Sequence, residues 1–187
     1  MSQTNKTNPF STLNLPARFD LDATAIERAY LTGLTSAHPD AGGGGSGDGL
    51  SEDSDGPDAA TLNQARMTLL DSEQRAVALL DVLGGASASQ CKDLPDGFLM
   101  EMMTRREEIE EQIADGGNES RSNWEAWARE ERASYTNEAK ALFDAIAEES
   151  TLEKLVDIRV LLNAWRYIER LIEQLDPEYD PARADFR

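Results

Sequence analysis

The chain has 187 residues, with 36 Asp and Glu against 18 Lys and Arg, a formal net charge of −18, one His and one Cys. A single Cys excludes an internal disulfide and a thiolate cluster for zinc or an iron–sulfur centre, which favours a reducing compartment. The negative charge repels phosphate backbones and anionic lipids, so we expect neither nucleic acid nor membrane as a partner. The amino terminus resembles no signal or transit peptide, and no apolar run approaches the ~20 residues that span a bilayer. We therefore expect a soluble, cytoplasmic protein.

Apolar residues at spacings of three and four predict helices from the start of the chain. One short helical turn is expected from Pro9 to Leu13. A longer helix begins after Asp22, a suitable N-cap, and ends at His38, because Pro39 disfavours helical geometry in the residue before it.

Residues 41–58 contain seven Gly and five acidic residues but no basic residue, which predicts a mobile acidic surface loop. A second helix follows, with Asp58 or Thr61 as its cap, and should lie antiparallel to the first. A third runs from Glu73 to Leu83 and ends at a glycine pair, Gly84-Gly85, as a helix C-cap favours.

The second half begins with a small, polar linker over residues 86–97, which contains Cys91, whose role the sequence does not reveal. Three longer periodic segments follow: Phe98 to Ala114, stopped by Asp115-Gly116-Gly117, then Ser120 to about Glu149, then Leu152 to Leu175, ended by Pro177. No alternating strand pattern is present. The sequence therefore predicts an all-α chain whose residues 98–187 form a three-helix bundle.

The only histidine lies in His38-Pro39-Asp40, between two predicted antiparallel helices. A tripeptide alone occurs often by chance, as a helix stop followed by a turn. Its place between the two helices, however, resembles that of the same motif in J-domains. Residues 1–85 would then be the J-domain.

Further segments resemble the HscB-type J-proteins in particular. They are Asn8 to Asp22 (NPFSTLNLPARFDLD), Leu62-Asn63-Gln64-Ala65 with Arg75-Ala76, Phe98-Leu99-Met100-Glu101 with Arg106-Glu107-Glu108, and, more weakly, Trp165 to Leu171. The resemblance covers most of residues 8–114 and follows the family's order.

This resemblance implies a co-chaperone of iron–sulfur cluster assembly with no cofactor and no catalytic residue of its own. Its J-domain would dock a DnaK/HscA-type ATPase chaperone through His38, Pro39 and Asp40, with Arg28 on the preceding helix, and stimulate ATP hydrolysis. Its bundle would bind the iron–sulfur scaffold protein and present it as a client.

The resemblance also implies a scaffold-binding face at the positions of Leu99, Met100 and Met103, with Tyr167 and its polar neighbour Arg166 from the last helix. Core packing is the alternative for the methionines. We expect that Leu99 or Met103 faces inward, since the helix must pack.

The chaperone-docking helix departs from the family pattern, because Arg28 is its only basic residue and Gly33 stands where a core Leu is usual. A mid-helix Gly costs about 1 kcal/mol against Ala, and a missing core side chain adds to this. Fewer charge pairs with an acidic chaperone surface would slow association. Either the partner has a less acidic surface, or the J-domain has lost its activity.

Three other functions remain open from the residues alone. They are a J-protein for another client, a helical adaptor with a decayed J-domain, and an enzyme that uses His38 as a general base. The last lacks an orienting partner and a pocket for the histidine.

Overall fold

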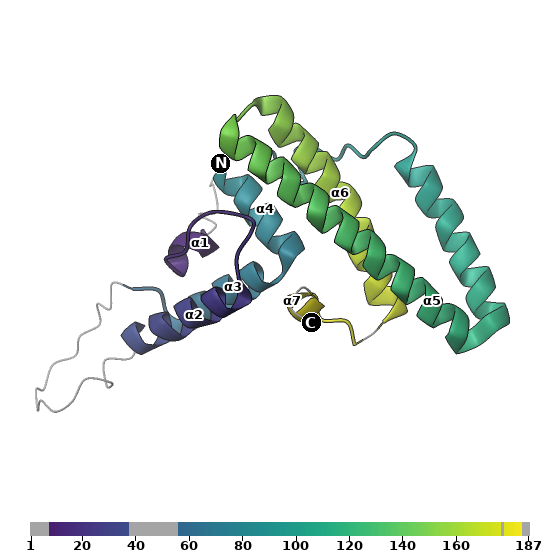
Figure 1. The fold of residues 1–187 in the computed structure, drawn as a ribbon, viewed down its shortest axis with the longest axis horizontal. Helices are drawn as coiled ribbons and strands as arrows, with labels where there is room; N and C mark the ends of the chain where they lie inside the picture. Colours follow the sequence, from purple (N-terminus) through teal and green to yellow (C-terminus); the bar gives the residue numbers. More distant parts are fainter. Residues whose placement is uncertain (1–7, 38–55, 177, 185–187) are drawn as a thin grey trace, which may run out of the picture.

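The structure, a computed structural model, describes residues 8–37, 56–176 and 178–184. These residues form helices and connecting segments, without a strand, as predicted. The helices are α1 (Pro9–Thr12), α2 (Ala23–Ala37), α3 (Ala59–Leu70), α4 (Ser72–Val82), α5 (Phe98–Glu148), α6 (Leu152–Leu175) and α7 (Pro181–Ala184). Figure 1 shows α1 to α4 on one side and α5 with α6 on the other. The His38-Pro39-Asp40 motif and most of the acidic loop lie outside the described residues.

Aspartate side chains cap the amino termini of α2 and α3 at positions that the sequence predicts. Asp22 accepts a hydrogen bond from the Thr24 amide at 2.7 Å, and Asp58 accepts one from the Thr61 amide at 2.7 Å. Of the two predicted caps for α3, Asp58 is therefore the one that acts.

The end of α4 confirms the predicted glycine cap. Gly84 has φ of +80°, its amide donates to Asp81 O at 3.1 Å, and the Gly85 amide donates to Leu80 O at 2.9 Å. This pair of bonds is a Schellman motif, which satisfies the last carbonyls of the helix.

α2 and α3 form the predicted antiparallel hairpin, which we call the docking hairpin. Arg66 of α3 donates from Nε to Glu27 Oε2 of α2 at 2.8 Å, and its guanidinium lies over the Tyr30 ring at 5.3 Å. One turn further along, a Cβ at Gly33 would lie 2.8 Å from Leu62 Cδ2. Leu62 is 1% exposed, so its side chain fills the space that the missing side chain at Gly33 leaves.

The predicted bundle is present, with a sharp break inside α5. Gly117 has φ of 60° and ψ of −133°, which is non-helical and strained for any residue with a Cβ. Figure 1 shows the first part of α5 running away from the linker and the second part returning beside α6. The helix boundary expected at Asp115 to Gly117 is confirmed.

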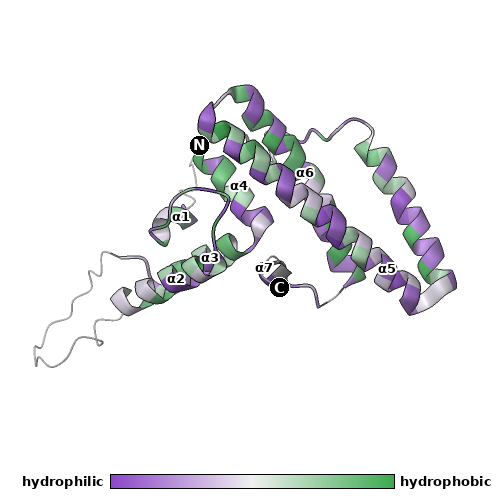
Figure 2. Ribbon diagram, in the orientation of Figure 1, coloured by the Kyte–Doolittle hydropathy of each residue, from purple (hydrophilic) through white to green (hydrophobic). Residues whose placement is uncertain are grey.

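Two hydrophobic cores hold the helices. The first combines buried residues of α1, α3 and α4 with others of α5 and α6, and includes a stacked pair, Phe19 and Phe143, at 5.5 Å between ring centroids. The second lies within the bundle, where Phe98, Met102 and Ile109 pack on α6. Figure 2 shows hydrophobic and hydrophilic residues alternating along the helices, as amphipathic packing requires.

Candidate functional surfaces

The exposed side of α2 carries one cation and several hydroxyl groups. Arg28 is exposed and forms no ion pair with a described residue, while Leu31 is 58% exposed. The Thr32 and Thr35 hydroxyls donate to carbonyls of their own helix, each at 2.9 Å. These hydroxyls already donate within the helix, and Arg28 is the exposed cation that this side offers to a partner. The described exposed side of α2 thus carries a single basic residue, as the sequence indicates.

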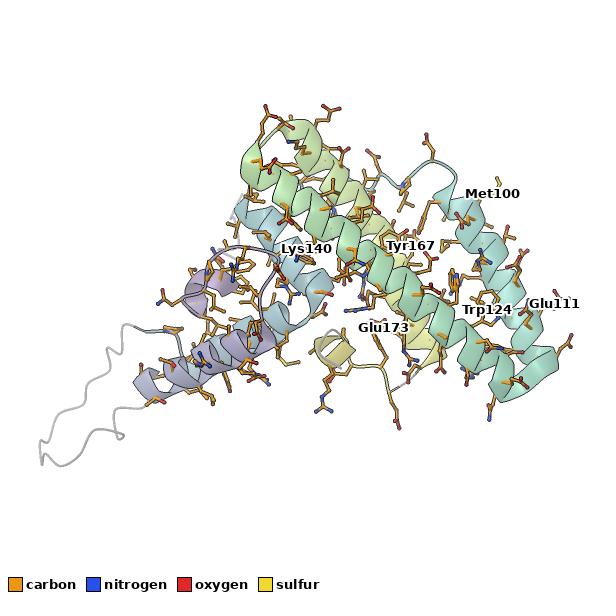
Figure 3. The ribbon with its side chains drawn as sticks, viewed as in Figure 1. Met100, Glu111, Trp124, Lys140, Tyr167 and Glu173 are labelled. Atoms are coloured by element: carbon orange, nitrogen blue, oxygen red, sulfur yellow. The ribbon has the colours of Figure 1, made fainter. Side chains whose placement is uncertain are left out.

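A second surface lies at the start of α5, where three apolar side chains face solvent. Leu99, Met100 and Met103 are 52%, 76% and 59% exposed, whereas Phe98 and Met102 are buried. The expectation that Leu99 or Met103 faces inward is therefore wrong, because Phe98 and Met102, also four residues apart, take the inward positions. Figure 3 shows Met100 on the part of α5 far from the docking hairpin.

A groove of about 560 Å³ runs beside these side chains. Its lining combines apolar groups with two carboxylates, and consists of Leu94, Pro95, Asp96, Gly97, Leu99, Met100, Met103, Thr104 and Glu107. A smaller groove of about 320 Å³ lies on the other flank of Met100. Exposed apolar side chains beside a groove are typical of a binding surface, and methionine suits such a surface through its flexibility.

Tyr167 of α6 joins this surface through Phe98. The two rings make an edge contact with 5.6 Å between centroids, and Tyr167 is 39% exposed. We call Leu99, Met100, Met103 and Tyr167 the methionine surface.

Arg166 is engaged elsewhere. Its Nη1 lies 3.3 Å from Glu73 Oε2 of α4 and 3.5 Å from Glu173 Oε1 of α6. The structure therefore joins Arg166 to the α1–α4 half of the molecule.

A buried polar network, which sequence reasoning missed, crosses between α4 and the bundle. Glu169 Oε1 accepts from Arg132 Nε and from Trp165 Nε1, both at 2.8 Å. Arg132 Nη2 also donates to Ser72 Oγ of α4 at 2.8 Å. Glu169 Oε2 accepts from the Tyr179 hydroxyl at 2.7 Å, and burial with this bond raises the pKa of Tyr179. Apart from Trp165 and Glu169, which lie one helical turn apart, no local sequence pattern links these residues, and Ser72 and Tyr179 lie 107 positions apart (179 − 72).

Within the ranges that the structure describes, no group of three or more His, Cys, Asp or Glu could hold a metal ion. Over these same ranges, no helix is long and apolar enough to cross a membrane. Trp124 and Trp127 form an edge-to-face pair with the Arg105 guanidinium over both rings.

Comparisons with known proteins find relatives among the HscB co-chaperones. Residues 94–176 match the family model described as the HSCB C-terminal oligomerisation domain. The co-chaperone protein HscB homolog of Burkholderia cenocepacia is 31% identical over 173 residues, which cover 89% of this chain and 97% of that protein. The homolog of Paraburkholderia phytofirmans is 29% identical over 170 residues, covering 89% and 95%.

Solved structures show the same fold. The chaperone HscB from Vibrio cholerae matches with a TM-score of 0.66 and 20% identity, over 91% of this chain and 96% of that one. Human co-chaperone protein HscB matches with a TM-score of 0.66 and 17% identity, over 95% and 85%. An amino-terminal J-domain followed by a helical domain is therefore the fold of this chain.

Proposed function

This chain belongs to the HscB family of co-chaperones, and from that premise we propose that it stimulates ATP hydrolysis by a DnaK/HscA-type chaperone and delivers the iron–sulfur scaffold protein to it. Residues 1–85 would act as the J-domain, residues 86–97 as a linker and residues 98–187 as the client-binding bundle. The protein would work in the cytoplasm, hold no nucleotide and catalyse no reaction itself. It would act by binding one conformational state of the ATPase more tightly than another.

The methionine surface carries this proposal. Its apolar side chains remain exposed on a helix whose inward positions are already filled by Phe98 and Met102, so core packing does not account for them. A partner that covers Leu99, Met100 and Met103 would remove apolar area from water, at about 25 cal/mol for each Å². Figure 3 shows Met100 far from the docking hairpin, which leaves room for a chaperone and a scaffold on one molecule.

The docking hairpin supports the chaperone half of the proposal. His38, Pro39 and Asp40 directly follow α2, whose last described residue is Ala37. Pro39 restricts the backbone, and His38 with Asp40 offers hydrogen-bonding groups to a partner. Arg28 lies on the same helix as its exposed cation.

Single-turnover ATP hydrolysis tests the proposal directly. The organism's DnaK-type chaperones are measured with this protein, with its His38→Gln variant, and with added scaffold protein. We expect stimulation that the variant loses and that the scaffold increases. Stimulation without any effect of scaffold would favour a J-protein for another client. A failure to stimulate any of the chaperones would indicate an adaptor with a decayed J-domain and overturn the proposal.

A further inference from the structure

The chain continues past α6 and returns to the J-domain. Residues 178–184, which we call the C-terminal strap, include α7, and α7 contacts α3 of the docking hairpin. Figure 1 shows α7 lying between α3 and the end of α6. The family domain matched by this chain ends at residue 176, so the strap lies beyond it.

Tyr179 attaches the strap to the bundle. Its ring packs against the second core, and its hydroxyl donates to Glu169 Oε2 at 2.7 Å. Glu169 is 2% exposed and uses its other oxygen for Arg132 and Trp165. The Tyr179 hydroxyl thus hydrogen-bonds to one oxygen of the buried Glu169 carboxylate, and the other oxygen accepts from Arg132 and Trp165.

The same network reaches the J-domain through a second route. Arg132 donates to Ser72 Oγ, which is completely buried at the start of α4. At the far end of the strap, Ala182 packs against the first core, the one that contains α1, α3 and α4. Asp180 caps α7 locally by accepting from the Ala182 amide at 3.1 Å. The strap therefore contacts both cores, one at each end.

We propose that the C-terminal strap holds the docking hairpin in one orientation relative to the methionine surface, with Tyr179 and Glu169 as its positioning residues. The functional part of this inference rests on the proposed function, because only then do the two surfaces hold a chaperone and its client. Tyr167 belongs to the methionine surface, and Glu169 lies two residues further along α6. One turn of this helix therefore carries a residue of the client surface and a residue that attaches the strap.

The expected effect is a shift between docked and undocked arrangements. A hydrogen bond to a buried charged group contributes enough that its loss changes such an equilibrium about tenfold. Tyr179→Phe removes the bond and keeps the ring. Tyr135→Phe is the matched control, because the half-buried Tyr135 hydroxyl has no hydrogen bond to the described residues.

Distances between spin labels test the orientation without any partner. Labels are attached to Asn63→Cys on α3 and Glu130→Cys on α5, both exposed positions, in a Cys91→Ser background. We expect a narrow distance distribution that broadens in Tyr179→Phe and further in a chain ended after Asp176, while Tyr135→Phe stays narrow. Narrow distributions in both strap variants would overturn the inference, and so would equal broadening in the control.

The functional arm uses the full chain with chaperone and scaffold. We expect Tyr179→Phe to keep its scaffold affinity and its stimulation of the chaperone alone, and to lose most of the increase that scaffold adds. A purely structural role would lower all three together. If the wild-type protein stimulates no chaperone, the proposed function fails, whereas the label distances still decide the role of the strap.

Discussion

Glu73 of α4 and Arg166 of α6 form an ion pair between the J-domain and the bundle, with 3.3 Å between Oε2 and Nη1. Glu73 is 4% exposed. Burial raises the pKa of this carboxyl to about 7, and the charge of Arg166 lowers it without offsetting the burial. Asp71 and Glu169 raise the pKa further through repulsion. The carboxylate that receives Arg166 is thus costly to ionise.

Stability should therefore fall as the pH rises through the range where Glu73 ionises. The folded protein binds this proton more tightly than the unfolded chain, whose pKa is near the ordinary value of 4.5. The contribution is fully present below the ordinary value, is lost as the pH rises to about 7, and amounts to about 3 kcal/mol. Urea unfolding of wild type and Glu73→Gln at pH 5 and pH 8 checks this. The variant should gain relative to wild type at pH 8, and parallel profiles would contradict the assignment.

Gly33 and Leu62 predict a compensating pair of substitutions. Because a Cβ at Gly33 would lie 2.8 Å from Leu62 Cδ2, Gly33→Leu overpacks the docking hairpin and should cost about 1–3 kcal/mol of unfolding free energy. Leu62→Ala alone leaves a cavity and should cost about 2–5 kcal/mol. The double variant should lose less than the sum, since the new leucine occupies the space. Additive losses in chemical denaturation would show that the two side chains do not share this space.

Met102 and Met103 are neighbours with opposite expected roles. Met102→Ala removes a buried side chain and should cost about 2–5 kcal/mol of stability. Met103→Ala truncates a side chain that is 59% exposed and should change stability by less than about 0.5 kcal/mol. Calorimetric titration with the scaffold protein should show weaker binding for Met103→Ala and for Met100→Ala. Unchanged affinity in both would remove the methionine surface from client binding.

The methionine surface also shows where prediction from sequence stops. Periodicity identified the helix, and the glycines at its end identified the break at Gly117. Periodicity did not distinguish the buried pair, Phe98 and Met102, from the exposed pair, Leu99 and Met103, because the residues of both pairs are apolar and four positions apart. Only the helix that packs against them, α6, decides which pair is buried.

Long-range polar contacts lie outside the reach of local patterns for a related reason. Arg132 and Glu169 look in the sequence like ordinary charged residues of amphipathic helices. Their pairing depends on how α5 and α6 align. The strap could not be predicted either, since a helix of four residues, α7, is too short to show a periodic pattern. The caps, by contrast, depend on neighbouring residues alone: Asp22 was correctly predicted, and Asp58 is one of the two caps predicted for α3.

The acidic loop should weaken chaperone docking through charge repulsion. Glu52, Asp53 and Asp55 lie outside the described residues, so this prediction rests on the sequence. Because the docking helix offers Arg28 as its exposed cation, changing all three acids to Lys should tighten binding to an acidic chaperone surface. The gain should be largest at low salt and shrink near 0.1 M ionic strength, where screening acts over about 10 Å. Affinities measured across a salt series check this, with Glu110→Lys on the distant part of α5 as the control. Equal affinity at low ionic strength would contradict the predicted repulsion.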